Sequence, residues 1–201
     1  MSKVIVFLNL SLDGVMQGPG RPDEDSRGGF KYSGWAAPYS EPSMGKTVGE
    51  SMATTGGILL GRRTFEDFFD YWPKQKDNPF TDVLNNSQKY VASKTLKEPL
   101  PWMNSTLLKG DVPKAVAKLK KDLDKDLVVL GSGMLVQSLM KEDLIDKYIL
   151  LIHPLVLGTG KRLFPDGTAL TALKLVSTEP TKKGVMINIY EPTEPMADMN
   201  S

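Results

Sequence analysis

The stretch LVVLGSGM at residues 127–134 constrains the fold of this chain most strongly. Four apolar residues without polar alternation are typical of a strand buried on both faces of a parallel sheet. The glycines that follow open directly into a predicted helix over 134–140. The stretch LLGRRT at residues 59–64 has the same order of buried strand, glycine and helix start. Together the two stretches predict strand–helix units and a parallel sheet.

The apolar run VIVFL at residues 4–8 predicts another strand buried on both faces, at the centre of the sheet. Three helix starts carry capping side chains: Ser43, Thr64 with Asp67 three residues later, and Asp111. Strands are also predicted over 58–60, 90–92, 106–108, 148–152, 173–177 and 185–190, and helices over 44–54, 65–71, 81–85 and 112–125. Alternating units followed by a strand-rich C-terminal part favour a mainly parallel mixed sheet, with antiparallel strands at one edge.

A loop over residues 17–42 is rich in Gly and Pro and is longer than most loops inside a compact domain. Such loops usually serve as lids or binding loops, or they are disordered. Trp35 and Tyr39 argue against full disorder here. A length of 201 residues suits one hydrophobic core, so we expect a single domain over 1–191 and a flexible tail over 192–201.

Composition excludes several classes of protein. The chain has no Cys and one His, His153, which precedes a proline. Zinc sites, disulfide frameworks, thiol nucleophiles and Ser-His-Asp triads draw on these residue types, so we predict no metal site and none of these chemistries. A formal net charge of +1 without a basic block argues against nucleic acid or an anionic membrane as partner. With no apolar segment of about 20 residues and no signal-peptide pattern, we expect a cytoplasmic protein.

Ligands of an open α/β sheet bind at the carboxyl ends of its parallel strands, where helix N-termini favour anions. The turns that begin at Gly61 and Gly131 could therefore hold a diphosphate between them, with Arg62 and Arg63 beside one turn. Either turn alone could also be an ordinary tight connection. The turn at Gly131 lacks the third glycine of a Rossmann fingerprint, and no Walker A sequence occurs in the chain.

Further candidate residues lie near predicted strand ends. Ser93 and Lys94 follow the predicted strand 90–92 and suit a phosphomonoester, or they form a capped turn. Asp13 lies in a turn after the first strand and could face the ligand, although Asp-Gly is mainly a turn sequence. His153 is more simply a packed residue than a base. Each tryptophan could stack on a heterocycle, but packing in the core or the lid is the simpler interpretation for Trp35, Trp72 and Trp102.

Five motifs in order carry a resemblance to a known family. They are SLDG at 11–14, LGRRTFE at 60–66, LGSG at 130–133, LIDKY at 144–148 and PLVLGTGKRLF at 154–164. The set resembles the reductase domain of the riboflavin-biosynthesis deaminase-reductases, in the dihydrofolate reductase-like superfamily, over residues 3–191. The chain looks like a stand-alone member, because a zinc deaminase domain would need cysteines. The resemblance implies a three-layer α/β/α fold with a mixed, mainly parallel sheet, NADPH as hydride donor, and a homodimer.

The resemblance also implies roles for residues at matching positions. The cofactor phosphates would be held on one side by Gly61, Arg62, Arg63 and Thr64, and on the other by Gly131, Ser132, Gly133, Met134 and Leu135. Ser93 and Lys94 would bind the adenosine ribose phosphate, and the backbone of Asn9 and Leu10 would lie along the nicotinamide. Asp13 would lie at the substrate end. From the residues themselves, we expect Asp13 to orient substrate or relay a proton, with Glu50 as an alternative because its predicted helix borders loop 17–42, and Trp35 as a candidate substrate contact.

Riboflavin-pathway members of this family reduce 5-amino-6-(5-phosphoribosylamino)uracil, but their substrate-binding residues have no recognisable counterpart in loop 17–42. We therefore expect NADPH-dependent hydride transfer to a heterocyclic or ribosylated small molecule. Two alternatives stay open. One is a dihydrofolate or pterin reductase-like enzyme, in which Glu50 would be the carboxylate that pairs with the ring. The other is a catalytically silent nucleotide-binding domain.

Overall fold

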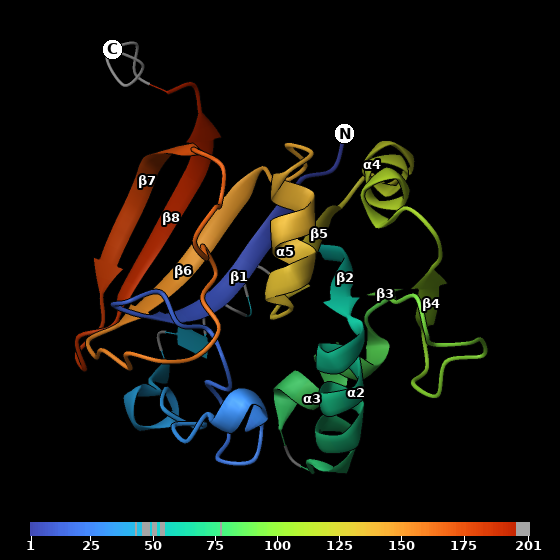
Figure 1. Ribbon diagram of the computed structural model, residues 1–201. Coiled ribbons are helices and arrows are strands. Elements are labelled where there is room, and N and C mark those ends of the chain that lie inside the picture. The colour runs from blue at the N-terminus through green and yellow to red at the C-terminus, as the bar shows by residue number, and fades with distance from the viewer. Residues whose placement is uncertain (43, 46–48, 50–51, 53–54, 77, 196–201) are drawn as a thin grey trace.

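Eight strands form one sheet in the order β4-β3-β2-β5-β1-β6-β8-β7 (Figure 1). The computed structural model describes residues 1–195 except 43, 46–48, 50–51, 53–54 and 77. The strands are β1 Val4–Ser11, β2 Thr55–Gly61, β3 Lys89–Ala92, β4 Ser105–Leu108, β5 Asp126–Leu130, β6 Lys147–His153, β7 Ala172–Pro180 and β8 Met186–Thr193. Strands β1 to β6 pair in parallel, and β8 pairs antiparallel with β6 and β7. The predicted mixed sheet with antiparallel strands at one edge is confirmed.

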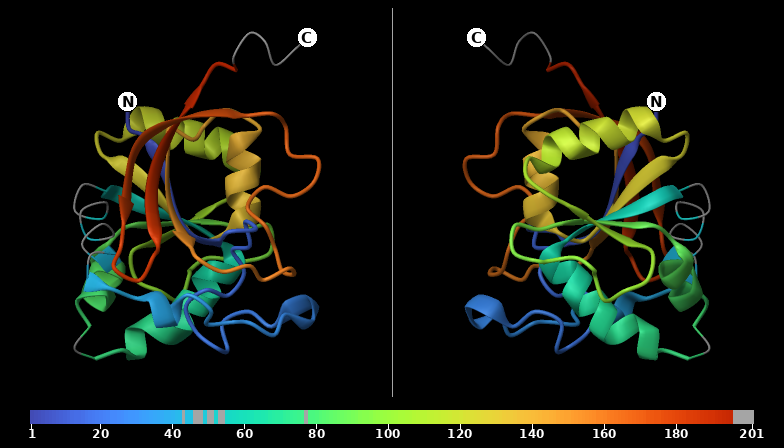
Figure 2. Two further views of the ribbon diagram at one scale, coloured as in Figure 1. Left: turned by 90° about the vertical axis from the view of Figure 1, so that its left-hand side faces the viewer. Right: turned by 90° about the vertical axis from the view of Figure 1, so that its right-hand side faces the viewer.

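The side chains of β1 alternate between the two faces of the sheet, and helices cover both faces. Val4, Val6 and Leu8 pack on the face covered by α4 (Val112–Asp122) and α5 (Gly133–Met140). Ile5 and Phe7 pack on the face covered by α2 (Arg62–Tyr71) and α3 (Pro79–Asn86). A strand buried on both faces needs apolar residues at every position, which is why this sequence does not alternate. The helices form one layer on each face, which confirms the three-layer α/β/α arrangement (Figure 2).

Two of the predicted helix starts can be compared with the structure. The carboxylate of Asp111 accepts a hydrogen bond from the Lys114 backbone N–H at 3.1 Å, so its capping role is confirmed. The prediction that Thr64 caps a helix is wrong. Helix α2 already begins at Arg62, because the chain turns into the helix directly after Gly61. Thr64 lies in the first turn, where its hydroxyl has a different partner.

The predicted C-terminal tail can also be compared with the structure, whereas the predicted helix over 44–54 largely cannot. Strand β8 continues to Thr193, which pairs with Ala172 of β7, so the predicted tail over 192–201 begins too early. The predicted helix over 44–54 falls largely outside the described residues, together with its Ser43 cap and the candidate Glu50. Within the part of the chain that the structure describes, no helix is long and apolar enough to cross a membrane.

The loop over 17–42 is folded and lies beside α2 (Figures 1 and 2). The side-chain amide of Gln17 donates to the Arg27 carbonyl at 2.9 Å, and Trp35 Nε1 donates to the Gln17 carbonyl at 2.8 Å. Further along the loop, Arg21 forms an ion pair with Asp67 of α2, with Nη2 and Oδ1 2.5 Å apart. The first two contacts hold the loop together, and the ion pair attaches it to α2. Its short 3-10 helices are η1 Arg27–Gly29 and η2 Ala37–Tyr39.

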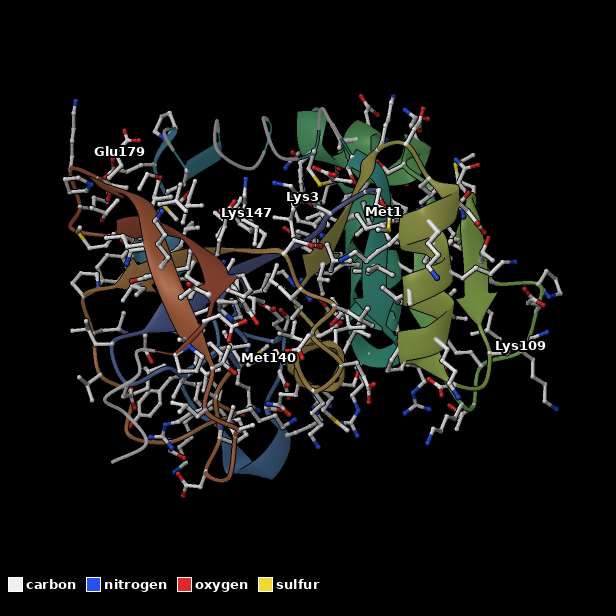
Figure 3. The ribbon with its side chains drawn as sticks, turned by 90° about the horizontal axis from the view of Figure 1, so that it is seen from above. Met1, Lys3, Lys109, Met140, Lys147 and Glu179 are labelled. Atoms are coloured by element: carbon white, nitrogen blue, oxygen red, sulfur yellow. The ribbon has the colours of Figure 1, made fainter. Side chains whose placement is uncertain are left out.

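The two edges of the sheet lie far apart, marked in Figure 3 by Glu179 on β7 and by Lys109 just after β4. Strand β7 has nine residues and is exposed over most of its length. Leu175 and Val176 near its centre are 47% and 51% exposed. An edge strand of this kind leaves backbone donors and acceptors unpaired and invites a further partner.

Candidate functional site

A cleft of about 1480 Å³ lies at the carboxyl ends of the parallel strands. Asn9 of β1, Gly61 of β2, Ala92 of β3 and Leu130 of β5 all line it. These four strands are parallel neighbours, so their carboxyl ends meet at one edge of the sheet, as the sequence predicted. Because ligand pockets usually measure about 300–1,000 Å³, the cleft has room for a cofactor and a second ligand.

Both glycine turns predicted to bind phosphate reach this cleft. Its lining includes Gly61, Arg62, Arg63 and Thr64 from one turn and Gly131, Ser132, Gly133, Met134 and Leu135 from the other. Helices α2 and α5 begin at these turns. Among the described residues, neither N-cap makes a side-chain capping bond and neither first turn contains an acidic residue. First-turn N–H groups and the positive ends of two helix dipoles therefore suit a diphosphate that lies between the helices.

The Ser132 side chain joins the two turns. Its Oγ accepts a hydrogen bond from the Gly61 N–H at 2.7 Å and donates one to Thr64 Oγ1 at 2.8 Å. Ser132 has a φ of 65°, a left-handed conformation that residues other than glycine rarely adopt. At the next position, a Cβ on Gly133 would lie 2.5 Å from Met16 Sδ, so a side chain there would displace Met16. The two turns are thus positioned before any ligand binds, which lowers the cost of binding one.

Cationic side chains gather at this end of the cleft, which we call the phosphate end. Arg62 Nη1 donates to Thr95 Oγ1 at 2.9 Å and so connects α2 to the turn after β3. Arg63 and Lys94 also line the cleft, and among the described residues neither forms an ion pair. Ser93 lines it too, but its Oγ accepts two backbone N–H groups of its own turn. Both interpretations of this segment, a capped turn and a phosphate contact, are therefore compatible with its geometry.

Asn9 is held in place by the single histidine of the chain. His153 is fully buried at the end of β6, and its Nε2 lies 2.9 Å from Asn9 Oδ1. The amide oxygen can only accept, so Nε2 carries the proton, and Nδ1 has no partner among the described residues. Trp35 and Tyr39 meet the ring edge to face, with centroids 5.1 and 5.4 Å away. Burial lowers the pKa of His153 to about 4, so the ring is neutral near neutral pH.

The predicted packing role of His153 is therefore confirmed. The same hydrogen bond also orients the Asn9 amide, because Oδ1 is held at His153 while Asn9 lines the cleft. Among the described residues, the Asn9 NH₂ group has no partner, so it is a candidate donor to a ligand.

Asp13 lies outside the cleft lining and holds a turn instead. Its carboxylate accepts hydrogen bonds from Ser11 Oγ at 2.6 Å and from the backbone N–H groups of Leu157 and Gly158 at 3.1 and 2.9 Å. Burial disfavours its charged form, but these hydrogen bonds outweigh burial and lower the pKa of Asp13 to about 2. A carboxylate with this pKa holds no proton to relay at neutral pH. The structure therefore gives no support to the expectation that Asp13 orients substrate or relays a proton.

Three other expected site residues are also absent from the described lining of the cleft. Leu10 is 4% exposed and packs in the core with α4 and α5. Trp35 is 7% exposed and packs inside the loop, so its expected contact with substrate is not supported. Glu50 lies outside the described residues. Of the other tryptophans, Trp102 is in the core as predicted, and Trp72 packs against the same core cluster as predicted but also lines the cleft.

An aromatic wall that the sequence did not predict lines the cleft at the opposite end of α2. The side chains that form it, together the aromatic end, are Phe68, Tyr71, Trp72 and Phe80. Phe68 and Tyr71 follow Thr64 by four and seven residues, so they lie on the same face of the helix. Aromatic residues at helical spacing usually indicate core packing, and only their register with the glycine turn could have shown that they face the cleft.

The fold first defines the class: the chain has a dihydrofolate reductase-like α/β fold. A dihydrofolate reductase from Enterococcus faecalis, complexed with NADP(H), matches with a TM-score of 0.60 at 16% identity, over 96% of this chain and 97% of that chain. A putative riboflavin biosynthesis protein from Shewanella sp. PV-4 matches with a TM-score of 0.69 at 22% identity, over 96% and 99% of the two chains. At these identities the likeness shows the fold alone.

Sequence comparison then supplies the family. The family model of the RibD C-terminal domain matches residues 2–187, so the chain belongs to that family. The uncharacterized protein YyaP of Bacillus subtilis (strain 168) is 31% identical over 194 residues, 94% of this chain and 94% of YyaP. The resemblance read from the five motifs is thereby confirmed. Membership in this family implies a reductase.

Proposed function

We propose that this protein is an NADPH-dependent reductase that transfers hydride to a heterocyclic or ribosylated small molecule. One observation carries the proposal: two helix N-termini without capping side chains face the same cleft, beside Arg62, Arg63 and Lys94. A dinucleotide with an additional phosphate matches this arrangement, because it brings a diphosphate to the turns and a phosphomonoester to the cations.

The residues at the phosphate end divide into two groups. The diphosphate would lie between the turns that begin at Gly61 and Gly131, where it accepts hydrogen bonds from first-turn N–H groups. The 2′-phosphate would bind Arg62 and Lys94, which the contact between Arg62 and Thr95 brings to the same turn. NADH lacks this phosphate, so these two cations would favour NADPH.

NADPH supplies a hydride from its dihydronicotinamide ring, and uptake of one further proton by the acceptor balances the two-electron reduction. The residues of this chain bind and orient the reactants. The Asn9 NH₂ group, oriented through His153, would donate to a carbonyl oxygen of the ring bound at the end of β1. Since the Asp13 carboxylate remains ionised in its turn, we assign the proton to water rather than to Asp13.

A binding titration followed by a turnover screen tests the proposal. The protein should bind NADPH in calorimetry, and it should oxidise NADPH, followed by absorbance, with at least one acceptor among pterins, pyrimidines and quinones. Failure to bind NADPH would refute the proposal. Tight binding without oxidation across the panel would instead support the catalytically silent nucleotide-binding domain.

The homodimer and the cytoplasmic location belong to the same proposal. Strand β7 supports a dimer, because a nine-residue exposed edge strand with Leu175 and Val176 at its centre offers a second copy both backbone and apolar contacts. Light scattering should give twice the chain mass, and Val176→Lys should lower it. If this variant were still a dimer, the dimer interface would not be formed by β7.

A further inference from the structure

The aromatic end lies about 13 Å from the phosphate end, because nine residues of α2 separate Arg62 from Tyr71 at about 1.5 Å each. Its four aromatic side chains are all half-buried, so each keeps surface that the cleft can offer to a ligand. Trp72 joins them: its ring centroid lies 6.3 Å from that of Phe68, 5.1 Å from that of Tyr71 and 4.9 Å from that of Phe80. These edge-to-face contacts create a rigid apolar wall suited to a flat ring.

The charged groups beside this wall are acidic overall. Arg21 lies over the Tyr71 ring, 4.2 Å from its centroid, and its two Nη atoms contact the Asp67 carboxylate at 2.5 and 3.3 Å. Glu24 accepts hydrogen bonds from the backbone N–H groups of Gly20 and Arg21 at 2.5 and 3.0 Å. One guanidinium thus faces two carboxylates that line the cleft, in addition to Asp23 at 3.3 Å from its Nε, and its Nη atoms are already engaged. A phosphate placed here would meet negative charge and lack a cationic partner.

The remaining cations of the cleft already have carboxylate partners. Arg27 and Lys161 both pair with Asp25, and Arg162 pairs with Asp13 at 3.4 Å. At the phosphate end, Arg62 forms a long, exposed ion pair with Glu66 at 3.8 Å, and among the described residues the lining cations without an acidic partner are Arg63 and Lys94. The cleft therefore offers one strongly anion-binding end and one aromatic end.

We infer that the second ligand of this cleft is a planar aromatic or heteroaromatic compound without a phosphate group, which stacks at the aromatic end. The inference rests on the proposed function, in which NADPH occupies the phosphate end. A flat ring would gain stacking contacts from Trp72 and its neighbours. A phosphoribosyl compound would need a further cationic site, which the described residues do not provide.

Riboflavin and FMN test this inference, because they share one ring system and differ by a phosphate. Both are titrated into the full-length protein with saturating NADP⁺, and binding is followed by quenching of flavin fluorescence. We expect riboflavin to bind about tenfold or more tightly than FMN. Tyr71→Leu should weaken riboflavin binding about tenfold, since one aromatic side chain of the wall is lost. Tyr32→Leu, on an exposed loop position outside the cleft, is the matched control and should change nothing.

A second variant tests the role of negative charge beside the aromatic wall. Glu24→Gln removes one of the two carboxylates that line the cleft there, so the affinities for riboflavin and FMN should become more similar. Equal or tighter binding of FMN by the unmodified protein would overturn the inference, and so would the absence of riboflavin binding while NADP⁺ binds. Failure of NADP⁺ itself to bind would overturn the proposed function, so the two failures are distinguishable.

Discussion

His153 provides a sharp test of the site, because it is the only histidine in the chain and is fully buried. Burial lowers its pKa from 6.5 to about 4. Between these values the unfolded chain binds a proton that the folded protein does not, so stability falls as the pH drops through this window. Above about pH 6.5 both states are neutral at this position, and the contribution of His153 no longer changes.

The size of the effect follows from the two pKa values. At about 1.36 kcal/mol per tenfold change in proton affinity, the gap between 6.5 and about 4 corresponds to about 3 kcal/mol of stability lost on acidification. His153→Phe keeps a ring between Trp35 and Tyr39 but removes this titration. It also removes the Nε2 hydrogen bond to Asn9, together with the Nδ1 atom that has no partner among the described residues. We therefore expect little change near neutral pH, within about 1 kcal/mol.

Urea unfolding of both proteins from about pH 7 to pH 4 measures the difference. Carboxylates titrate equally in the two proteins, so their effect cancels when the free energies of unfolding are subtracted. As the pH falls, the free energy of unfolding should decrease less for the variant than for the parent, and the difference should reach about 3 kcal/mol near pH 4. If the free energy of unfolding changed equally with pH in the two proteins, burial would not be lowering the pKa of His153. A histidine NMR signal that titrates near 6.5 in the folded protein would show the same.

Three further predictions concern residues that hold the site or the fold. Asp13→Asn should cost about 1 kcal/mol of stability and leave NADP⁺ affinity unchanged, because its carboxylate holds the turn at Leu157 and Gly158. A tenfold loss of NADP⁺ affinity at unchanged stability would contradict this prediction. Asp124→Asn, at an exposed position, is the control. Ser132→Ala should weaken NADP⁺ binding about fivefold in calorimetry, since it removes the hydrogen-bond partner that Gly61 and Thr64 share. The control variant Ser177→Ala, on β7, should leave NADP⁺ binding unchanged. Lys89 is fully buried and its Nζ donates to the Leu84 and Ser87 carbonyls at 2.7 and 2.8 Å. Lys89→Met should therefore cost about 2 kcal/mol in urea unfolding, whereas Lys118→Met on an exposed position should stay within about 0.5 kcal/mol.

The sheet could be predicted from sequence because its strands are buried on both faces. Continuous apolar runs such as 4–8 and 127–130 leave few other interpretations, and the glycines after two of the strands mark helix starts. Local rules failed where tertiary contacts decide the outcome. Thr64 matched a capping sequence, but its hydroxyl bonds to Ser132 on another element, and no pattern within one segment shows that contact.

The same limit explains the errors at the site. Asp13 is in a motif of the family and near a strand end, but its partners at Leu157 and Gly158 come from a distant part of the chain. Trp35 and Trp72 are alike in sequence terms, and only packing shows that the first is enclosed in its loop while the second lines the cleft. The phosphate end could be predicted because its glycines and cations are contiguous. The aromatic end depends on which face of α2 turns toward the cleft.

We propose that the phosphate end binds NADPH through Arg62 and Lys94. This assignment is tested by calorimetric titration of NADPH and NADH, with the parent protein and the Arg62→Ala, Lys94→Ala double variant. The parent should bind NADPH about tenfold or more tightly than NADH, since charge-assisted contacts to a phosphate are each worth about 1.5–3 kcal/mol. The double variant should bind both nucleotides with similar affinity. Equal affinities in the parent protein, or a preference that survives in the double variant, would contradict the claim.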